Sequence, residues 1–584
     1  MKLSEYVLRF FKSKGIDKVF LVNGGSIAFL IDAFRKVKSI DYVCAVHEQG
    51  AAMMADGYAR TKKKPGVTMV TSGPGAQNLV TGIASSWFDS IPTIHICGQI
   101  NSNDFLISKK KYPVRQRGFQ ETDIVSISRP ITKFAYRLKK PEEIEKILNK
   151  AYEISINGRP GPVLLDIPMN FQNQKIVIKN KFLNIKKLNQ KKLKNKELLK
   201  LKSKIINSKR PLLIVGGGIE ISNTKDELFK FCKKINIPVV ASWAGYGSID
   251  KQIKHFVGTI GVYGSRVANI CLQKSDFIIN LGCRLDTRVI GGKRYNFAPN
   301  AEIASVDIDR NELNKTHGLK IKYKIETDLK SFFKKFLLLK NLKTQTKLDW
   351  VNEIHNLKSK YEDVQVNKNL NRNYVNPYRF FQLLSKKIKK NDIIVGDTGA
   401  HLTWAVQGLK IGNNNKLISS FGNSPMGYAL PASIGACFSK KNNTVFSING
   451  DASLQLNLQE LQTIKNYKLK LKIFILNNSG YGIIKQFQDA YLNSRYEASN
   501  KGSGVTNPNF KYLAKSFDLD YVSINNDREI FPKFKKIFKN NKTTIIEINI
   551  FPNEKIIPKL IYGRQLDDMY PNLTKKNISK LRLN

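Results

Sequence analysis

The run Asn449-Gly450-Asp451-Ala452-Ser453 lies between an apolar segment, Val445–Ile448, and a helix-like segment, Leu456–Tyr467. A second apolar segment, Ile473–Leu476, follows and ends at Asn477-Asn478. This order predicts a strand, a turn, a helix, a second strand and a second turn. In a parallel α/β sheet both turns lie at the carboxyl edge, where ligands bind.

Polar side chains follow both predicted strands. Asp451 offers a carboxylate oxygen and Asn478 an amide oxygen, and a Mg²⁺ ion that also holds substrate phosphates takes ligands of these kinds. Gly450 breaks the first strand, and the small residues Ala452 and Ser453 leave backbone N–H groups free to face a diphosphate at the helix start. By itself, a Gly-Asp pair at a strand end is also typical of an ordinary turn.

The whole chain alternates helical and apolar extended segments, which predicts an α/β fold with doubly wound parallel sheets. Its 584 residues are too many for one hydrophobic core, and we expect three such domains. The predicted organisation is 1–175 as the N-terminal domain, 176–210 as a linker, 211–335 as a central Rossmann-like domain, 336–375 as a connector, 376–552 as the C-terminal domain, and 553–584 as an irregular tail. The tail either folds over an active site or is loose.

Charge and cysteine usage limit the class of protein. The net charge of +51 fits either nucleic-acid binding or a compositional bias towards solvated lysines. The lysines are spread along the chain without a nucleic-acid-binding motif, which favours the second interpretation and no specific nucleic-acid partner. The lysine run 186–194 fits a linker or a basic patch. Six cysteines without CxxC pairing, no long apolar run and an immediate N-terminal helix predict a cytoplasmic protein with reduced core cysteines and no membrane span.

A second motif lies about 400 residues before the first. The string His47–Arg60 places Glu48 at the end of a predicted strand and at the start of a helix rich in small residues. A glutamate at such a position is often only a partner of the helix dipole. The loop Thr71-Ser72-Gly73-Pro74-Gly75 follows the next predicted strand.

The two motifs together resemble those of thiamine-diphosphate (ThDP) enzymes, and the resemblance runs from Leu3 to about Phe551. It implies a pyrimidine-binding N-terminal domain and a diphosphate-binding C-terminal domain. In this family Glu48 would bond to N1′ of the aminopyrimidine, so that the 4′-nitrogen can take the C2 proton. Met426 would support the bent cofactor, although a core methionine is the alternative. The implied metal ligands are Asp451, Asn478 and Gly480, and the implied ThDP contacts are Glu48, Gly25, Gly399, His401, Met426, Gly450, Ala452 and Ser453.

Within that family the chain is most similar to the large, catalytic subunits of acetolactate (acetohydroxyacid) synthases. Gly118-Phe119-Gln120-Glu121 resembles the segment whose Phe and Gln border the reacting carbons. Gly282–Val289 resembles the string in which Arg288 would hold the carboxylate of a second 2-oxo acid; a surface arginine is the alternative. The resemblance also implies a non-redox FAD in the central domain, with Gly217, Gly218, Arg288 and Asp307 as contacts.

Some residues depart from the family pattern. Met169 replaces a usual lysine, and Asn23-Gly24-Gly25 stands for Pro-Gly-Gly. The loop Tyr112–Arg117 resembles that of related enzymes in surface-glycan and secondary pathways. Phe487 occupies the place of a tryptophan that shapes the acceptor pocket, so we expect a weak preference for 2-oxobutyrate over pyruvate as acceptor.

The sequence therefore predicts a ThDP- and Mg²⁺-dependent carboligase of the branched-chain amino-acid biosynthesis type. It would decarboxylate pyruvate and join the two-carbon unit to a second 2-oxo acid. One alternative is a related ThDP lyase or ligase that uses a keto sugar, an aldehyde or an acyl-CoA as acceptor. A second is a non-catalytic basic scaffold. The resemblance implies a homodimer or homotetramer with active sites at the interface, and a regulatory subunit as a further partner.

Overall fold

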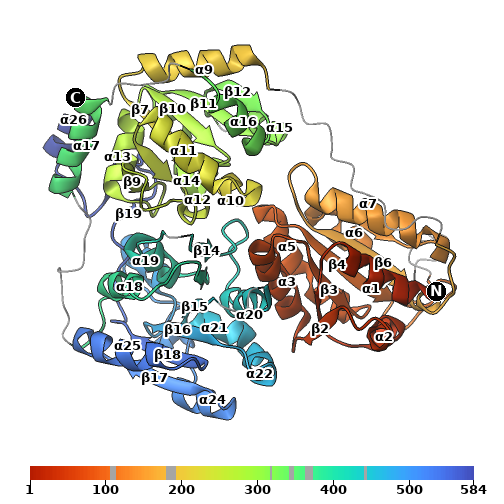
Figure 1. Ribbon diagram of the computed structural model, residues 1–584. Coiled ribbons are helices and arrows are strands. Elements are labelled where there is room, and N and C mark those ends of the chain that lie inside the picture. Colours follow the sequence, from red (N-terminus) through yellow and green to blue (C-terminus); the bar gives the residue numbers. More distant parts are fainter. Residues whose placement is uncertain are drawn as a thin grey trace.

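The computed structural model describes residues 1–105, 114–178, 193–315, 318–340, 347–361, 373–412, 414–439 and 443–583, which form three lobes (Figure 1). Each lobe is built on a six-stranded parallel sheet with helices against it, so the predicted α/β class is confirmed. A two-stranded antiparallel sheet lies in the C-terminal tail.

The N-terminal lobe carries a sheet of order β2-β1-β3-β4-β6-β5. Its central strands are buried along their whole length, as expected where helices cover both faces. The strands are β1 (Lys18–Leu21), β2 (Asp41–Cys44), β3 (Gly66–Val70), β4 (Thr93–Gln99), β5 (Phe134–Arg137) and β6 (Val163–Pro168). The helices are α1 (Leu3–Ser13), α2 (Ala28–Asp32), α3 (Glu48–Lys62), α4 (Pro74–Asn78), α5 (Val80–Asp89), α6 (Ile124–Ser128), α7 (Ile144–Ile156) and α8 (Met169–Gln172).

The C-terminal lobe repeats that strand order as β14-β13-β15-β16-β18-β17. The strands are β13 (Ile393–Gly396), β14 (Lys416–Ile418), β15 (Val445–Gly450), β16 (Leu471–Asn477), β17 (Asp520–Ile524) and β18 (Thr544–Asn549). The helices are α18 (Pro377–Ser385), α19 (Ala400–Gly408), α20 (Ala429–Ser439), α21 (Asp451–Leu454), α22 (Leu461–Asn466), α23 (Gly482–Tyr491), α24 (Phe510–Ser516) and α25 (Ile530–Lys539).

The central lobe has the order β12-β11-β10-β7-β8-β9, which is the doubly wound order of dinucleotide-binding folds. The strands are β7 (Pro211–Val215), β8 (Val239–Ala241), β9 (Phe256–Thr259), β10 (Phe277–Leu281), β11 (Glu302–Asp307) and β12 (Ile321–Glu326). The helices are α9 (Asn195–Asn207), α10 (Gly218–Ser222), α11 (Lys225–Ile235), α12 (Trp243–Tyr246), α13 (Arg266–Lys274), α14 (Thr287–Ile290), α15 (Arg310–Asn314), α16 (Leu329–Phe336) and α17 (Leu348–Tyr361).

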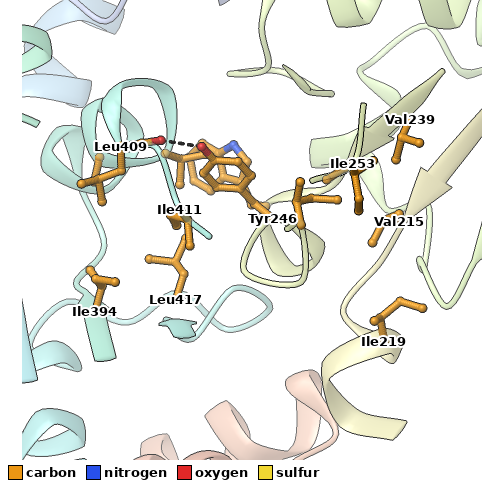
Figure 2. Close-up of a cluster of buried hydrophobic side chains, with 14 of the residues drawn as sticks. Val215, Ile219, Val239, Tyr246, Ile253, Ile394, Leu409, Ile411 and Leu417 are labelled. Atoms are coloured by element: carbon orange, nitrogen blue, oxygen red, sulfur yellow. Dashed lines mark hydrogen bonds between the residues drawn. The ribbon is translucent and has the colours of Figure 1, made fainter. Parts of the chain in front are cut away.

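The three lobes pack closely on one another. Helix α3 lies along α20, so the N-terminal and C-terminal lobes meet helix to helix (Figure 1). One hydrophobic core continues from the central lobe into the C-terminal lobe, and Figure 2 shows part of it. There the Tyr246 hydroxyl donates to the Leu409 carbonyl, and Leu417 lies in the same cluster.

The helix expected at Leu456–Tyr467 is broken. The chain instead forms α21, a 3-10 segment (Gln455–Glu460) and α22, with a kink at Asn457. The Asn457 side chain donates to the Gly427 carbonyl at 2.8 Å, and its own backbone leaves the helical region. A tertiary hydrogen bond therefore competes with the regular helix.

Both connecting regions contain helices that belong to the central core. Leu198, Leu201 and Ile205 of α9 are buried in that core, so the predicted linker 176–210 ends earlier than expected. In the predicted connector, α17 buries Trp350, whose indole N–H donates to the Pro211 carbonyl. The linker lysines 186, 187, 191 and 192 lie outside the described residues, as do Tyr112 and Pro113 of the N-terminal loop.

The tail is more regular than expected. It contains β19 (Lys559–Leu560), β20 (Met569–Tyr570) and α26 (Lys575–Leu583). The Leu560 N–H donates to the Val262 carbonyl at 2.7 Å, and Arg266 donates to the Pro571 carbonyl at 2.6 Å. From Lys559 onward the tail therefore docks on the central lobe, because Leu560 and Leu566 are part of that core.

The cysteine prediction holds for most positions. All six cysteines are unpaired, and Cys97, Cys232, Cys271 and Cys283 are buried. Cys437 is half-buried, whereas Cys44 is exposed and is not a core residue.

Candidate functional site

Asp451 lies at the carboxyl end of β15, beside the end of β16. It is buried, with 2 % of its surface exposed. Its Oδ2 atom accepts hydrogen bonds from the Gly480 N–H at 2.9 Å and from the Asn507 amide at 2.7 Å. Burial raises the pKa of Asp451, and these donors oppose that shift by stabilising the carboxylate.

The turn after β16 supplies the other predicted metal ligands. Asn478 is buried, and its side-chain nitrogen has no hydrogen-bond partner among the described residues. Gly480 has a φ of 131°, and a Cβ there would lie 2.3 Å from the Ser499 carbonyl oxygen, so glycine is required. The buried Lys485 ammonium donates to the Asn478 carbonyl at 3.0 Å and also to the Pro552 carbonyl.

The backbone N–H groups of this turn have partners within the turn. The Ala452 N–H donates to the Asp451 Oδ1 atom at 2.9 Å, and its contact with a diphosphate stays a prediction. The Ser453 hydroxyl accepts from the Gly450 N–H at 2.9 Å and donates to the Gly450 carbonyl. Local side-chain bonds thus cap the short helix α21.

His401 lies against the same turn. A Cβ on Gly450 would be 2.7 Å from its Nδ1 atom, and one on Gly399 would be 2.4 Å from its Cε1 atom. Burial lowers the pKa of His401 to about 3, so the imidazole is neutral at pH 7. Its buried Nε2 atom has no partner in the described part of the chain, which fits an external polar group at this edge.

These residues fit a magnesium diphosphate better than a bare cation. In the described ranges, no three His, Cys, Asp or Glu side chains come together as metal ligands. Asp451 offers one carboxylate, and Asn478 and Gly480 offer neutral groups. Mg²⁺ bound by so few protein charges depends on substrate phosphates for its remaining ligands.

Glu48 begins α3 in the N-terminal lobe and is half-buried. Its Oε2 atom accepts from the Asn78 amide at 2.9 Å, and its Oε1 atom would lie 3.2 Å from a Cβ on Gly75. Gly73, in the same loop, has a φ of 59° and leaves no room for a Cβ against Gln120. The loop 73–75 therefore lies against both Glu48 and Gln120.

Phe119 precedes Gln120 and is 84 % exposed. Gln120 is half-buried, with a φ of 62°. A Cβ on Gly25 would have no heavy atom within 4 Å, whereas a Cβ on Gly24 would lie 2.5 Å from Thr71. The tight glycine of this loop is thus Gly24, and the structure places no such constraint on Gly25.

The two predicted halves of the site lie in different lobes of the chain. Glu48 bonds to Asn78, and Asp451 bonds to Gly480 and Asn507. Among the described residues, no hydrogen bond or ion pair joins the first pair to the other three residues. The start of α3 instead contacts the C-terminal lobe through Glu460, which accepts from the His47 N–H at 3.0 Å.

Met426 is half-buried in the loop between β14 and α20. Asp397 accepts from the N–H groups of Gly427 and Ala429, both at 3.0 Å, and so fixes the loop just after Met426. Burial raises the pKa of Asp397 to about 7, although backbone donors act in the opposite direction.

A cavity of about 1110 Å³ opens where the strand order of the central sheet reverses, between β7 and β10. Gly217, Gly218, Arg288 and Asp307 all line it, so the structure brings the predicted FAD contacts together. Burial raises the pKa of Asp307 to about 6.

Arg288 is held by aromatic rings that the motif did not predict. Its guanidinium carbon lies 5.0 Å from the centre of the Trp243 ring and 6.0 Å from that of Tyr263. Such contacts orient an arginine without neutralising its charge. Trp243 and Tyr263, like Asn507 and Lys485, carried no sequence signal because they come from other segments of the chain.

Family models match most of the chain. Residues 1–127 match "Thiamine pyrophosphate enzyme, N-terminal TPP binding domain", residues 198–336 match its central domain, and residues 397–548 match its C-terminal TPP binding domain. In the described residues, no helix is long and apolar enough to cross a membrane.

Full-length relatives are similar throughout. The chain is 33% identical to "Acetolactate synthase large subunit" of Lactococcus lactis subsp. lactis (strain IL1403), over 97% of this chain and 95% of the relative. It is 33% identical to the protein of that name from Buchnera aphidicola subsp. Schizaphis graminum (strain Sg), over 99% of both chains. It is 29% identical to "Acetolactate synthase isozyme 2 large subunit" of Escherichia coli (strain K12), over 98% of this chain and 100% of the relative.

Proposed function

This chain belongs to the thiamine pyrophosphate (ThDP) enzyme family, and we propose that it decarboxylates pyruvate and joins the remaining two-carbon unit to a second 2-oxo acid. The similarity to acetolactate synthase large subunits over nearly the whole chain carries this proposal. The residues of the site support it. The half-buried Glu48 carboxylate can exchange a proton with the cofactor, and Asp451 and Asn478 at the carboxyl edge of the C-terminal sheet can bind a magnesium diphosphate.

ThDP, when bound, supplies an acidic C2 position and accepts the electron pair that decarboxylation leaves behind. Glu48 would share a proton with N1′ of the aminopyrimidine, and Asn78 keeps the Glu48 carboxylate in place. Met426 would support the bound cofactor. Asp451, Asn478 and Gly480 would hold Mg²⁺ and the diphosphate.

Residues on other elements would receive the second substrate. Arg288 binds the carboxylate of the acceptor 2-oxo acid, and its guanidinium can do so through two hydrogen bonds. Gln120 and Phe119 border the reacting carbons. Phe119 is largely exposed, as expected for a side chain that a bound substrate or a second subunit would cover.

The central cavity would take FAD in a non-redox role. A volume of about 1110 Å³ is large enough for a dinucleotide, and the cavity lies at the switch point of a doubly wound sheet. Gly217 and Gly218 allow close approach to its phosphates, and Asp307 suits a ribose hydroxyl.

The active protein is proposed to be a homodimer or homotetramer. The family resemblance implies that each complete site would combine the N-terminal lobe of one subunit with the C-terminal lobe of another. A regulatory subunit, a cytoplasmic location and a role in branched-chain amino-acid biosynthesis belong to the same proposal. They rest on the similarity to large subunits.

A ThDP lyase or ligase with another acceptor is the second candidate. The loop residues Tyr112–Arg117 and the ring of Phe487, which is smaller than that of tryptophan and 45 % exposed, favour it because both depart from the acetolactate synthase pattern. A non-catalytic scaffold is not favoured, because Glu48, Asp451 and Asn478 are all retained.

The test is an assay of the purified protein with ThDP, Mg²⁺, FAD and pyruvate, followed by acid treatment to convert 2-acetolactate to acetoin. Acetoin formation that requires ThDP is expected. Acetaldehyde as the main product would contradict the proposal and indicate a simple decarboxylase. Bound flavin, seen as a yellow protein, tests the FAD part separately.

A further inference from the structure

The loop that carries Met426 is held by a residue from another lobe. Asp89 is the last residue of α5 in the N-terminal lobe, and its side chain is 7% exposed. Its Oδ2 atom accepts from the Phe421 N–H at 2.8 Å, and its Oδ1 atom accepts from the Gly422 N–H at 2.8 Å. Both carboxylate oxygens thus bind backbone of the Met426 loop.

Asp89 is itself fixed by a buried ionic network. Arg60 of α3 donates to Asp89 at 2.9 Å and to Asp56 at 2.6 Å. Asp56 also accepts from the hydroxyl of Tyr428, just before α20. Because these charged side chains are buried and each makes several hydrogen bonds, their positions are closely fixed.

The Met426 loop is therefore anchored at two points. Asp89 holds residues 421–422, and Asp397 holds Gly427 and Ala429. Met426 lies in the short span between them. In that span Ser424 has a φ of 58°, which residues other than glycine adopt only when held, and its hydroxyl lies 2.8 Å from that of Thr398.

A residue of the central lobe, Arg284, also contacts the segment Phe88–Asp89 that holds the Met426 loop. Arg284 donates to the Phe88 carbonyl at 2.6 Å, and its Nη2 atom lies 3.9 Å from the Asp89 carboxylate. A Cβ on Gly422 would lie 2.7 Å from the Cβ of Phe88, 2.9 Å from Asp89 Oδ1 and 3.1 Å from Arg284 Nη2. The loop therefore has no room for a side chain at Gly422.

We propose that Asp89 is a positioning residue for Met426: its carboxylate, held by Arg60, sets the loop 419–427 so that the Met426 side chain supports bound ThDP. The inference rests on the proposed role of Met426, but not on which acceptor the enzyme uses. Asp89 would act through the loop backbone, to which both of its carboxylate oxygens bond.

The experiment compares Asp89→Asn with wild type in the full-length protein with ThDP and Mg²⁺. The readout is the rate of deuterium exchange at ThDP C2 in D₂O, measured by acid quench and NMR. This rate depends on how the two rings are held against each other. We expect exchange to slow at least tenfold, while ThDP affinity from calorimetry changes less than threefold because the diphosphate site is intact.

A second variant and a matched control make the result specific. Gly422→Ala disturbs the same contact between Asp89 and the Met426 loop, because the added methyl group would meet Phe88 and Asp89. It is expected to slow C2 exchange by a similar factor. Asp276 is the control, because its carboxylate also accepts from two successive backbone N–H groups, those of Lys209 at 2.6 Å and Arg210 at 2.9 Å, but in the central lobe. Asp276→Asn is expected to leave C2 exchange within twofold of wild type.

A double-mutant cycle tests whether Asp89 acts through Met426. In a Met426→Ala background, Asp89→Asn should add less than a twofold further loss of exchange rate. Full additivity would overturn the proposal, as would exchange within twofold of wild type in folded Asp89→Asn or, where that variant does not fold, in Gly422→Ala. Slow exchange in wild type, or unchanged exchange in Glu48→Gln, would instead contradict the proposed ThDP chemistry.

Discussion

At the scale of single residues, the site depends on side chains whose charge is set by their surroundings. His401 is neutral because burial lowers its pKa to about 3, whereas burial raises the pKa of Asp451 and the backbone and amide donors oppose that shift. Sequence motifs identified both residues. They did not identify Asn507 or Lys485, which contact Asp451 and Asn478 from 56 residues and 7 residues away.

Glu48→Gln should abolish most of the activity while leaving the fold intact. The amide retains a hydrogen-bonding oxygen for Asn78 but cannot exchange a proton with N1′, and acid–base groups of this kind contribute about 10²–10⁴-fold in rate. We therefore expect at least about a 100-fold lower kcat, with unchanged thermal unfolding and bound ThDP. Turnover near that of wild type would contradict the assigned role.

Phe487→Trp should increase the preference for 2-oxobutyrate over pyruvate as acceptor. The Phe487 ring is 45 % exposed and lies 4.8 Å from the ring of Tyr491, so it leaves space that a larger ring would fill. Filling a pocket by about one or two methylene equivalents is worth roughly 1–3 kcal/mol in discrimination. Competition between the two acceptors measures the ratio, which should be weak in wild type and at least about fivefold higher in the variant.

At the scale of elements, the packing of α3 on α20 joins the N-terminal and C-terminal lobes through glycines. A Cβ on Gly57 would lie 2.1 Å from the Ala432 carbonyl oxygen, and one on Gly435 would lie 1.9 Å from that of Met54. These contacts are between backbones, so no side-chain rotation can relieve them. The many small residues in His47–Arg60 thus have a packing reason that is independent of catalysis.

Gly57→Ala should weaken this contact between the lobes. The helices must separate to accept the methyl group, and overpacking of this kind costs about 1–3 kcal/mol. Gly292→Ala is the matched control, because Gly292 is exposed and a Cβ added there would have no atom within 4 Å. Denaturant unfolding should show a lower midpoint for Gly57→Ala and a shift of less than about 0.5 kcal/mol for the control. Equal midpoints would mean that α3 and α20 pack less tightly than the structure has them.

At the scale of the whole molecule, Glu220 connects the three lobes. Its carboxylate lies 2.8 Å from Lys225 of the central lobe, 3.2 Å from Lys416 of the C-terminal lobe and 3.8 Å from Lys63 of the N-terminal lobe. Burial alone would raise the pKa of Glu220, but these lysines lower it to about 2. Desolvation also lowers the pKa of Lys416 to about 8.

Glu220→Gln should reduce the stability of the protein at neutral pH. It should also make that stability change less between pH 7 and pH 3. Because the folded pKa lies below the unfolded value of 4.5, ionised Glu220 stabilises the protein above about pH 4.5, and this contribution disappears as the pH falls through about 2. The contribution is at most about 3–4 kcal/mol. Thermal midpoints at pH 7 and pH 3 measure it, and the difference between them should be smaller in the variant.

Glu302→Gln serves as the control for this measurement. The pKa of Glu302 is also lowered to about 2, by hydrogen bonds from Lys204 and Lys322, but all three residues lie in the central lobe. Since these ion pairs are more open to solvent, salt screens them, and 0.5 M NaCl should reduce the effect of Glu302→Gln more than that of Glu220→Gln. An equal response to salt would argue against Glu220 as a buried link between lobes.

The amino-acid sequence by itself determined three features. They are the α/β class, the alternation of helices and strands in both the N-terminal and the C-terminal lobe, and the two motifs around Glu48 and Asp451. These features are local, because strand, turn and helix signals lie within a few residues of one another. Only the tertiary structure decided that α9 and the tail belong to the central lobe, that Asn457 breaks a helix, and that Asp89 holds the Met426 loop. Each of these depends on contacts between residues far apart in the chain, and no local pattern encodes which distant partner a side chain meets.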